Sequence, residues 1–412
     1  MSFPIFSSAF SSAHPPIAAL KSTGNIRKSV TASKYELYSC VSQSFYDWSY
    51  QFELVIAAHT KGKIMRVKNV NRYIAQSLAL VTSVILLASG CGSSASSSAS
   101  TSNALSVGYA SCAHCIPMSL IPDQAKGVKL DMHQFQNGND SLMALMSKKV
   151  DVAQVTYGHL VTALNQGSPV VAISGQINGG SDIILSNDMK DKVSPGNWKE
   201  LSSYIKQKAS DGAKLKIGAN RGSSQDLQMR AQFSAEGIDV NKELDFVNIS
   251  NPADFKNNLV NKQIDLVSAV EPFASGIILS NSGYHFAYPY DQPMSNLTNI
   301  ILTRDDVIKS KSDALQQFVD ANVEVVKSLK DDTKPWVDAI VAKTSLDKAT
   351  AQRAVKNATP DYTIKLKSAE QVAKTLKDLG YVQKDVSGEV SSHVDYSFLA
   401  KATKQSETQL GK

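Results

Sequence analysis

Two stretches of the chain carry the same pattern, DSLMALMSKKVDV at residues 140–152 and DFKNNLVNKQIDL at residues 254–266. At equal spacing, both copies contain an Asp, a Leu, a Lys, an apolar residue and a second Asp. We interpret each copy as a helix that leads into a buried strand. A second pair matches upstream, Leu-Ser-Val-Gly at residues 105–108 and Leu-Lys-Ile-Gly at residues 215–218. Two matches in the same order predict two similar α/β lobes.

The surrounding chain alternates short β-branched apolar runs with helical segments, which favours an α/β fold with mainly parallel strands. We expect strands at residues 105–109, 150–155, 170–175, 182–185, 215–219, 244–249, 264–270 and 297–302. From about residue 310, apolar residues recur every three or four positions, which predicts a long helix with one apolar face. Further helices are expected near residues 335–343, 347–357 and 368–379. Gly380 is placed as the C-terminal cap of the last one.

Residues 65–90 have the pattern of a secretory signal peptide: three basic residues, an apolar run at residues 73–88 and small residues before Cys91. The apolar run is about 16 residues long, whereas a bilayer-spanning helix needs about 20, so a membrane helix is the weaker interpretation. Leu-Ala-Ser-Gly-Cys at residues 87–91 resembles a bacterial lipobox, with Ala88 where Leu is usual. That resemblance implies a diacylglycerol on Cys91. An ordinary signal peptide with an incidental Cys is the alternative.

The segments on either side of this signal do not resemble folded protein. Residues 91–103 are almost wholly Ser, Ala, Gly and Thr, a composition typical of a flexible tether. Residues 1–64 show no clear periodicity or motif, and a signal does not act from the middle of a folded protein. We therefore expect residues 1–64 to be an upstream extension of the reading frame. The mature protein is expected to be lipid-anchored on the extracytoplasmic face of the cell membrane.

The net charge of +6 comes from the N-terminal part of the chain. Residues 1–90 hold nine of the 43 Lys and Arg residues and three of the 37 Asp and Glu residues, which leaves 34 of each sign in residues 91–412. The mature part is therefore about neutral. Nothing in this balance indicates nucleic-acid binding.

Two α/β lobes turn the carboxyl ends of their strands toward a shared cleft, where ligands bind in open α/β sheets. We expect residues 104–180 and 289–412 to form the first lobe and residues 181–288 the second. The chain must then cross between the lobes twice. Gly179-Gly180 and the Tyr-Pro-Tyr stretch at residues 288–290 are the expected hinge segments, with plain surface turns as the alternative.

The order of these features resembles the periplasmic binding proteins for nitrate, taurine and aliphatic sulfonates, and the related thiamine-pyrimidine binders. The resemblance covers residues 104–330 and is carried by the lipobox and four short elements, at residues 107–109, 149–153, 167–173 and 270–273. It implies a two-lobed, type II-like fold with C-terminal helices packed on the first lobe. The chain departs from the family in its longer lead at residues 201–216 and in a Cys-Ala-His-Cys loop at residues 112–115.

The repeat aligns a loop after Gly108 with a loop after Gly218. The second loop contains Gly222, Ser223 and Ser224 at a helix start, where backbone N–H groups, hydroxyls and the helix dipole suit a small anion. In the resembling family this loop touches the ligand, which implies the same role for these residues. The alternative is an N-cap serine without a ligand.

The first loop contains Cys112, His114 and Cys115. In an exported protein, two nearby Cys residues favour a disulfide. A second interpretation is a soft-metal site that uses Cys112, His114, Cys115 and Met118, since Cys and thioether sulfur suit copper(I). A structural zinc site usually needs four protein ligands, and the sequence shows no second Cys pair. A third is direct contact of Cys112 or His114 with the ligand. These alternatives stay open at the level of the sequence.

Residues next to the strand ends complete the candidate site. They are Tyr109, which opens the first loop, Tyr157, Gln176, Asn178 and Glu271. Tyr157 could stack on a ligand or lie at the rim. Glu271 could accept a hydrogen bond from the ligand or simply favour the start of a helix.

The sequence contains no P-loop, no nucleophile elbow, no His-Glu-x-x-His and no dinucleotide fingerprint. The leading hypothesis is therefore a monomeric solute receptor of an ABC importer, without catalysis, cofactor or metal. It would bind a small oxyanion, sulfonate or heterocycle by hinge closure and deliver it to a membrane permease. A metal- or thiol-dependent binding protein that uses Cys112, His114 and Cys115 is the alternative. An enzyme on the same fold is a third hypothesis.

Overall fold

The computed structural model describes residues 103–290 and 299–412, which belong to one compact unit running from Ser97 to Lys412. The expected upstream extension, signal peptide, Cys91 and nearly all of the tether lie outside the described residues. So do the first two residues of the strand expected at residues 297–302.

One sheet, with the helices packed on it, forms lobe 1. Its strand order is β11-β4-β10-β3-β1-β2. The strands are β1 (Ala104–Ala110), β2 (Lys129–Phe135), β3 (Val152–Val155), β4 (Val170–Gly179), β10 (Ile300–Arg304) and β11 (Ala358–Asp361). Strands β2, β1 and β3 are parallel, whereas β10 is antiparallel to both β3 and β4.

The second sheet, with its helices, forms lobe 2 and has the order β7-β6-β8-β5-β9. Its strands are β5 (Ser181–Leu185), β6 (Leu215–Ala219), β7 (Leu244–Asn248), β8 (Leu266–Val270) and β9 (Tyr284–Ala287). Strands β7, β6 and β8 are parallel, and β5 is antiparallel to β8 and β9. Lobe 2 therefore reproduces the arrangement of β2, β1, β3, β10 and β4, and the prediction of two similar α/β lobes is confirmed.

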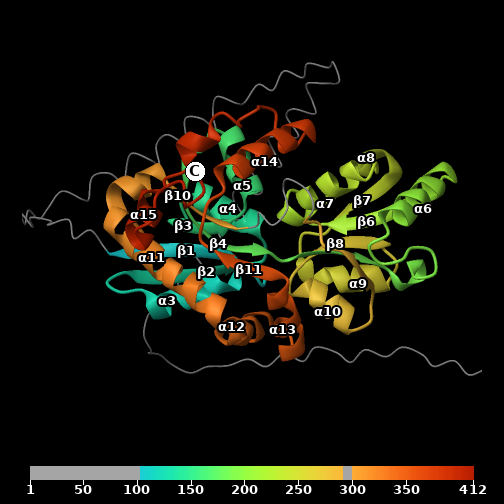
Figure 1. The fold of residues 1–412 in the computed structure, drawn as a ribbon, viewed down its shortest axis with the longest axis horizontal. Coiled ribbons are helices and arrows are strands. Elements are labelled where there is room, and N and C mark those ends of the chain that lie inside the picture. Colours follow the sequence, from blue (N-terminus) through green and yellow to red (C-terminus); the bar gives the residue numbers. More distant parts are fainter. Residues whose placement is uncertain (1–102, 291–298) are drawn as a thin grey trace, which may run out of the picture. The chain divides into compact units, whose positions relative to one another are not determined.

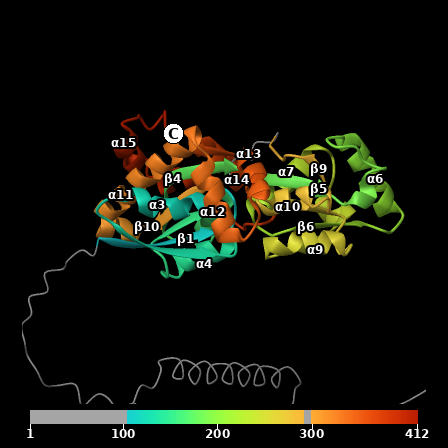
Figure 2. The same cartoon turned by 90° about the horizontal axis from the view of Figure 1, so that it is seen from below.

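Helices cover both sheets (Figure 1). Those on lobe 1 are α3 (Ile121–Gln124), α4 (Gly138–Met146), α5 (Tyr157–Asn165), α11 (Asp305–Asp331), α12 (Lys334–Thr344), α14 (Leu366–Asp378) and α15 (Ser397–Thr403). Those on lobe 2 are α6 (Trp198–Ser210), α7 (Ser224–Ala235), α8 (Val240–Glu243), α9 (Phe255–Val260) and α10 (Phe273–Leu279). Helix α13 (Lys348–Lys356) contacts both α12 and α10, and Figures 1 and 2 show it where the lobes meet.

The matching residues of the repeat occupy matching positions in the structure. Lys148 and Lys262 both adopt the left-handed conformation, with φ of 62° and 55°, at the end of α4 and α9. Asp151 then accepts a hydrogen bond from the N–H of Ser106 at 3.0 Å, and Asp265 accepts one from the N–H of Lys216 at 2.7 Å. The conserved spacing of the two copies thus fixes the turn from helix to strand and ties each strand to its parallel neighbour.

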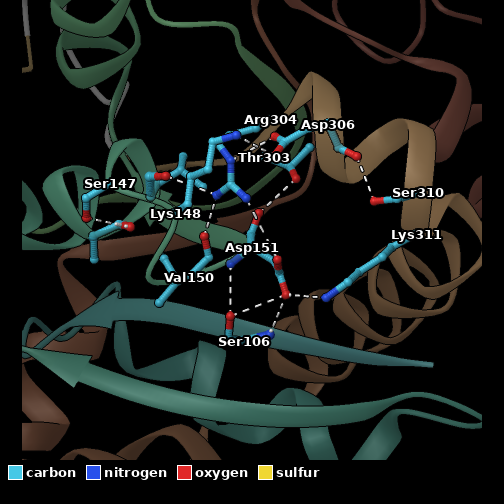
Figure 3. Close-up of polar contacts among 12 residues, drawn as sticks. Ser106, Ser147, Lys148, Val150, Asp151, Thr303, Arg304, Asp306, Ser310 and Lys311 are labelled. Atoms are coloured by element: carbon cyan, nitrogen blue, oxygen red, sulfur yellow. Dashed lines mark hydrogen bonds and ion pairs between the residues drawn. The ribbon is translucent and has the colours of Figure 1, made fainter. Parts of the chain in front are cut away.

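In lobe 1 the same aspartate also holds the long helix α11. The ammonium group of Lys311 lies 2.9 Å from Asp151, and the guanidinium group of Arg304 lies 3.9 Å from it (Figure 3). Asp151 precedes β3, so this charged cluster lies at the amino end of the strand. The cluster therefore lies at the opposite end of the sheet from the carboxyl ends of the parallel strands.

The chain passes from lobe 1 to lobe 2 between β4 and β5. Gly179 and Gly180 adopt φ values of 86° and 82°, which side chains rarely tolerate. A Cβ atom on Gly180 would in addition clash with Nδ1 of His114. The pair of glycines is therefore required by backbone conformation and by packing at this crossing.

The predicted strands and the C-terminal helices are present, and Gly380 follows α14 with a φ of 74°, as a C-terminal cap requires. Strands β2, β9 and β11 and helix α15 were not predicted. Strands β2, β9 and β11 are short or half-exposed and lie at the edges of the sheets, where the apolar pattern is weak. Across residues 103–290 and 299–412, no helix is long and apolar enough to span a bilayer.

Candidate functional site

Strand ends from both lobes meet around a cavity of about 50 Å³. Lobe 1 contributes the segments that follow β1, β2 and β3, and lobe 2 contributes the segments that follow β6 and β8. The polar side chains that line the cavity belong to Ser111, His114, Gln136, Asn137, Gln154, Thr156, His159, Asn220, Ser223, Ser224, Gln225 and Asn299. The other lining residues are Ala110, Cys112, Cys115, Gly138, Val155, Pro252, Phe255 and Val270. The cavity thus lies at the carboxyl ends of the strands, where open α/β sheets bind ligands.

Among the described residues that line the cavity, none is Asp, Glu, Lys or Arg, so these residues contribute no formal charge. Burial lowers the pKa of His114 from 6.5 to about 3 and the pKa of His159 from 6.5 to about 4. Both rings are therefore neutral at pH 7, and the lining is polar but uncharged.

Several polar atoms of this lining lack a partner. Within the part of the chain that the structure describes, neither Oε1 nor Nε2 of Gln154 is hydrogen-bonded, and Oδ1 of Asn299 and Nδ1 of His114 are also unpaired. Gln154 is only 1% exposed. An unpaired buried polar group costs about 1–3 kcal/mol, so such groups normally have partners. The unpaired atoms of Gln154 and Asn299 mark the cavity as a place for a polar ligand.

His159 is fixed by hydrogen bonds on both ring nitrogens. Its Nδ1 accepts from the N–H of Thr156 at 3.2 Å, which assigns the ring proton to Nε2. Nε2 then donates to Oδ1 of Asn139 at 2.8 Å. The amide of Asn139 reaches lobe 2, where it lies 3.4 Å from Oδ1 of Asn220 and 3.3 Å from the carbonyl of Arg221. This chain of contacts connects His159 in the cavity lining of lobe 1 to the residues of lobe 2 that face it.

Cys112 and Cys115 are joined in a disulfide, with 4.9 Å between their Cα atoms. Both are buried and belong to the same apolar cluster as Phe255 and Val270 of lobe 2. The disulfide therefore forms an apolar wall of the cavity and packs across the cleft. The donor atoms of Cys112, His114 and Cys115 all lie within 4.8 Å of one another, but in the disulfide neither sulfur is a thiolate that could bind a metal.

At the start of α7, side chains of the protein itself accept hydrogen bonds from backbone N–H groups. The hydroxyl of Ser223 accepts from the N–H of Asp226 at 3.3 Å, as an N-cap does, and the carboxylate of Asp226 accepts from the N–H of Gly222 at 2.9 Å. Asp226 is fully buried and paired with Arg230 at 2.8 Å. Ser223 and Ser224 line the cavity, but a buried carboxylate already occupies part of the electropositive helix start.

Six residues expected at the ligand do not line the cavity. The structure brings Cys112, His114, Ser223 and Ser224 to it, whereas Tyr109, Tyr157, Gln176, Asn178, Gly222 and Glu271 lie elsewhere. Tyr109 is buried in the core of lobe 1.

The C-terminal part of the chain engages three of the other residues. The hydroxyl of Tyr157 accepts from the N–H of Lys365 at 2.9 Å. Gln176 and Asn178 lie on β4, where β11 pairs alongside them. The amide of Gln176 donates to Asn322 at 3.0 Å, and that of Asn178 donates to Asp361 at 3.2 Å.

Glu271 belongs to a charged group beside the glycine crossing, which we call the hinge network: Asp182, Glu271, His285, Arg353 and Asn357. The guanidinium of Arg353 lies 3.8 Å from Asp182 and 3.6 Å from Glu271. His285 lies 2.8 Å from Asp182, and Asn357 donates to Glu271 at 3.3 Å. Burial raises the pKa of both carboxyl groups. This network ties α13 to lobe 2.

Sequence reasoning missed the cavity residues Gln154, His159, Asn220 and Asn299. A signal was available for two of them. Gln154 is the single polar side chain within β3 (Val152–Val155), and His159 stands three residues after Thr156, as in a capping box. Asn299 stands directly before β10, and no local sequence signature marks it as a cavity residue.

Comparisons with known proteins agree with this geometry. Residues 98–344 match the model of the NMT1-like family. No curated protein sequence matches the chain.

Solved structures show the same fold. The nitrate-binding protein NrtA of Synechocystis PCC 6803 aligns with a TM-score of 0.63 and 14% identity, over 75% of this chain and 91% of that one. The ligand-binding component of an ABC-type import system from Staphylococcus aureus, solved with zinc bound, gives 0.62 and 17% over 73% and 99%. The alkanesulfonate-binding protein SsuA of Xanthomonas axonopodis pv. citri, bound to MOPS, gives 0.58 and 15% over 72% and 99%.

Proposed function

The chain belongs to the NMT1-like family, and from that premise we propose that it is the solute receptor of an ABC importer, without catalysis of its own. The observation that carries this proposal is the cavity at the facing strand ends of the two lobes, lined by unpaired polar atoms of Gln154 and Asn299. A receptor needs such a site to hold a small molecule and release it again.

Closure of the lobes over the ligand is the proposed mechanism. The contacts that join the lobes around the cavity are apolar at the Cys112–Cys115 disulfide, which packs with Phe255 and Val270, and polar elsewhere. Asn137 donates to the carbonyl of Ser250 at 3.3 Å, and Tyr381 donates to the buried carboxylate of Asp226. In the proposed mechanism these contacts break when the lobes open and re-form when they close, while Gly179 and Gly180 supply backbone freedom at the crossing. The permease would then recognise the closed form.

The proposed partners follow from this role: a small-molecule ligand and the membrane permease of the importer, with the receptor acting as a monomer. The proposed location is the extracytoplasmic face of the cell membrane, with a lipid anchor on Cys91. The ligand classes considered at the outset were oxyanions, sulfonates and heterocycles. The nitrate and alkanesulfonate receptors among the structural neighbours keep the first two in view.

A second candidate function is metal or thiol chemistry at Cys112, His114 and Cys115, since their donor atoms lie within 4.8 Å of one another. It requires the disulfide to be reduced first. The two-electron reduction of the Cys112–Cys115 bond by a dithiol would yield two thiols, and only their deprotonated forms bind metal.

One experiment separates the two functions. Protein purified after expression of the full chain is exposed to a panel of small oxyanions, sulfonates, amides and pyrimidines, and to Zn²⁺ and Cu⁺ with and without a dithiol reductant. Melting temperature and the radius of gyration from X-ray scattering are measured. A receptor shows a higher melting temperature and a smaller radius with an organic or inorganic solute. A response to metal alone, present only after reduction and lost in Cys112→Ser, contradicts the receptor function and supports the second candidate.

A further inference from the structure

The chemistry of the cavity narrows the ligand class, on the premise that the proposed receptor function holds. We propose that the ligand is a small uncharged amide or urea, held by Gln154 and Asn299 through both donors and acceptors. Oxyanions and sulfonates are excluded by this proposal. The argument rests on the absence of charge, on the hydrogen-bonding capacity of the unpaired atoms and on the size of the cavity.

An anion would find no compensating cation in the cavity. No Lys or Arg is found among the described residues that line it. On the α7 side, the buried cation Arg230 is already paired with Asp226 at 2.8 Å. The Asp226 carboxylate also takes the N–H of Gly222, so it opposes any second negative charge at this helix start. Burying an unpaired charge is far more costly than burying a neutral polar group.

The unpaired atoms require a ligand that both donates and accepts. Gln154 presents its carbonyl oxygen and its NH₂ group, and neither has a partner among residues 103–290 and 299–412. Because both ends are unpaired, this conclusion does not depend on which way the amide is turned. Nitrate and sulfonate only accept hydrogen bonds, so one of them would leave the oxygen of Gln154 facing another oxygen. An amide or a urea carries an N–H next to a C=O and can satisfy both ends at once.

Asn299 adds a second acceptor in a fixed orientation. Its Nδ2 donates to the carbonyl of His114 at 2.8 Å, which leaves Oδ1 for a ligand donor. A ligand with two N–H groups, such as a primary amide or a urea, can therefore donate to Gln154 and to Asn299 together. The planar face of such a group suits the apolar wall formed by the disulfide and Phe255.

The size of the cavity agrees with this class. The cavity has a volume of about 50 Å³ and is the smallest in volume of the described cavities, which favours a small ligand. A short amide or a urea has this size.

Matched pairs of compounds test the proposal by isothermal titration calorimetry on protein purified after expression of the full chain. The pairs are acetamide and acetate, methanesulfonamide and methanesulfonate, and N-methylurea and nitrate. The first two pairs keep size and shape nearly constant and change charge and donors. We expect the uncharged member to bind at least ~100-fold more tightly in the acetamide and N-methylurea pairs, because a site built for hydrogen-bond donors rejects a ligand that lacks them.

Two variants locate the binding. Gln154→Leu is expected to weaken binding of the best amide or urea at least ~10-fold. Gln207→Leu, on the exposed face of α6 in lobe 2, is the matched control and should leave it unchanged. Tighter binding of the anions overturns the ligand class while the receptor function stands. Failure of all six compounds also overturns the ligand class, and the scattering experiment above then decides on the receptor function. An amide that binds equally well to the Gln154→Leu variant overturns the assigned role of Gln154.

Discussion

The cavity and the hinge network include two adjacent residues, yet the two regions differ in charge and in how their polar atoms are paired. Val270 lines the cavity, and Glu271 belongs to the hinge network. The cavity has no charged side chain among its described residues and holds several polar atoms without partners. The hinge network holds two buried carboxyl groups with a guanidinium between them. A ligand could therefore supply hydrogen-bond partners to the cavity, whereas the carboxyl groups of the hinge network form ion pairs within the protein.

The largest expected effect comes from removing the cation of the hinge network. Arg353→Ala leaves the buried Asp182 and Glu271 without their shared partner, and we expect a loss of about 3 kcal/mol in the free energy of unfolding. Guanidinium chloride denaturation measures this loss. Lys334→Ala, which breaks an exposed ion pair with Asp338, is the control and should lose much less stability than Arg353→Ala. Equal losses in the two variants would mean that the hinge network does not depend on charge.

Gly180→Ala should have the next largest effect, because Gly180 lies beside both the cavity residue His114 and the hinge network. The new methyl group meets the ring of His114 in a backbone conformation that disfavours side chains. We expect destabilisation by about 2 kcal/mol and weaker ligand binding. Gly212→Ala has a similar φ of 74° with open space around it, so it isolates the backbone contribution. If both variants lose the same stability, the contact with His114 carries no weight.

The pH dependence of stability should also differ between the two regions. The pKa of His159 is about 4 in the folded protein and 6.5 ordinarily, so between these values the unfolded chain binds a proton that the folded chain excludes. Stability therefore falls on acidification through this window, by up to ~1.4 kcal/mol per pH unit. Burial raises the pKa values of Asp182 and Glu271, so these carboxyl groups act in the opposite direction. Their contribution to the stability of the folded protein is lost as the pH rises.

Denaturation at pH 7, 6 and 5 checks this prediction. The stability of the His159→Gln variant should fall less steeply than that of the unmodified protein on acidification. If the stability of the His159→Gln variant changes with pH as steeply as that of the unmodified protein, His159 is not the group whose protonation the folded state disfavours.

The smallest expected effect has the opposite sign. Gln154→Leu removes two unpaired polar atoms from a buried position, so we expect it to stabilise the ligand-free protein by about 1 kcal/mol while it weakens binding. A melting curve without ligand measures the gain. Destabilisation would indicate that Gln154 has a structural role, as the residues of the hinge network have.

Features that depend on local sequence spacing could be predicted from the sequence. The repeat around Lys148 and Lys262 identifies the two lobes because turns and buried strands depend on local spacing. Cys112, His114, Ser223 and Ser224 reach the cavity because they follow strand ends directly.

The positions of other residues could not be predicted locally. Tyr157, Gln176, Asn178 and Glu271 are engaged by Lys365, Asn322, Asp361 and Asn357, which come from parts of the chain far away in sequence. The polar residue Asn322 falls on the apolar face of α11 because it bonds to β4. Edge strands such as β11, which displaces Gln176 and Asn178 from the site, have too few apolar residues to be recognised.

The most direct test is an experimental structure of the protein in complex with N-methylurea. We predict that the ligand lies in the cavity between the lobes, with its C=O and N–H within 2.7–3.2 Å of the two ends of the Gln154 amide and the Cys112–Cys115 disulfide beside it. A cavity that stays empty, a ligand bound elsewhere, or a Gln154 amide still without partners would contradict the account.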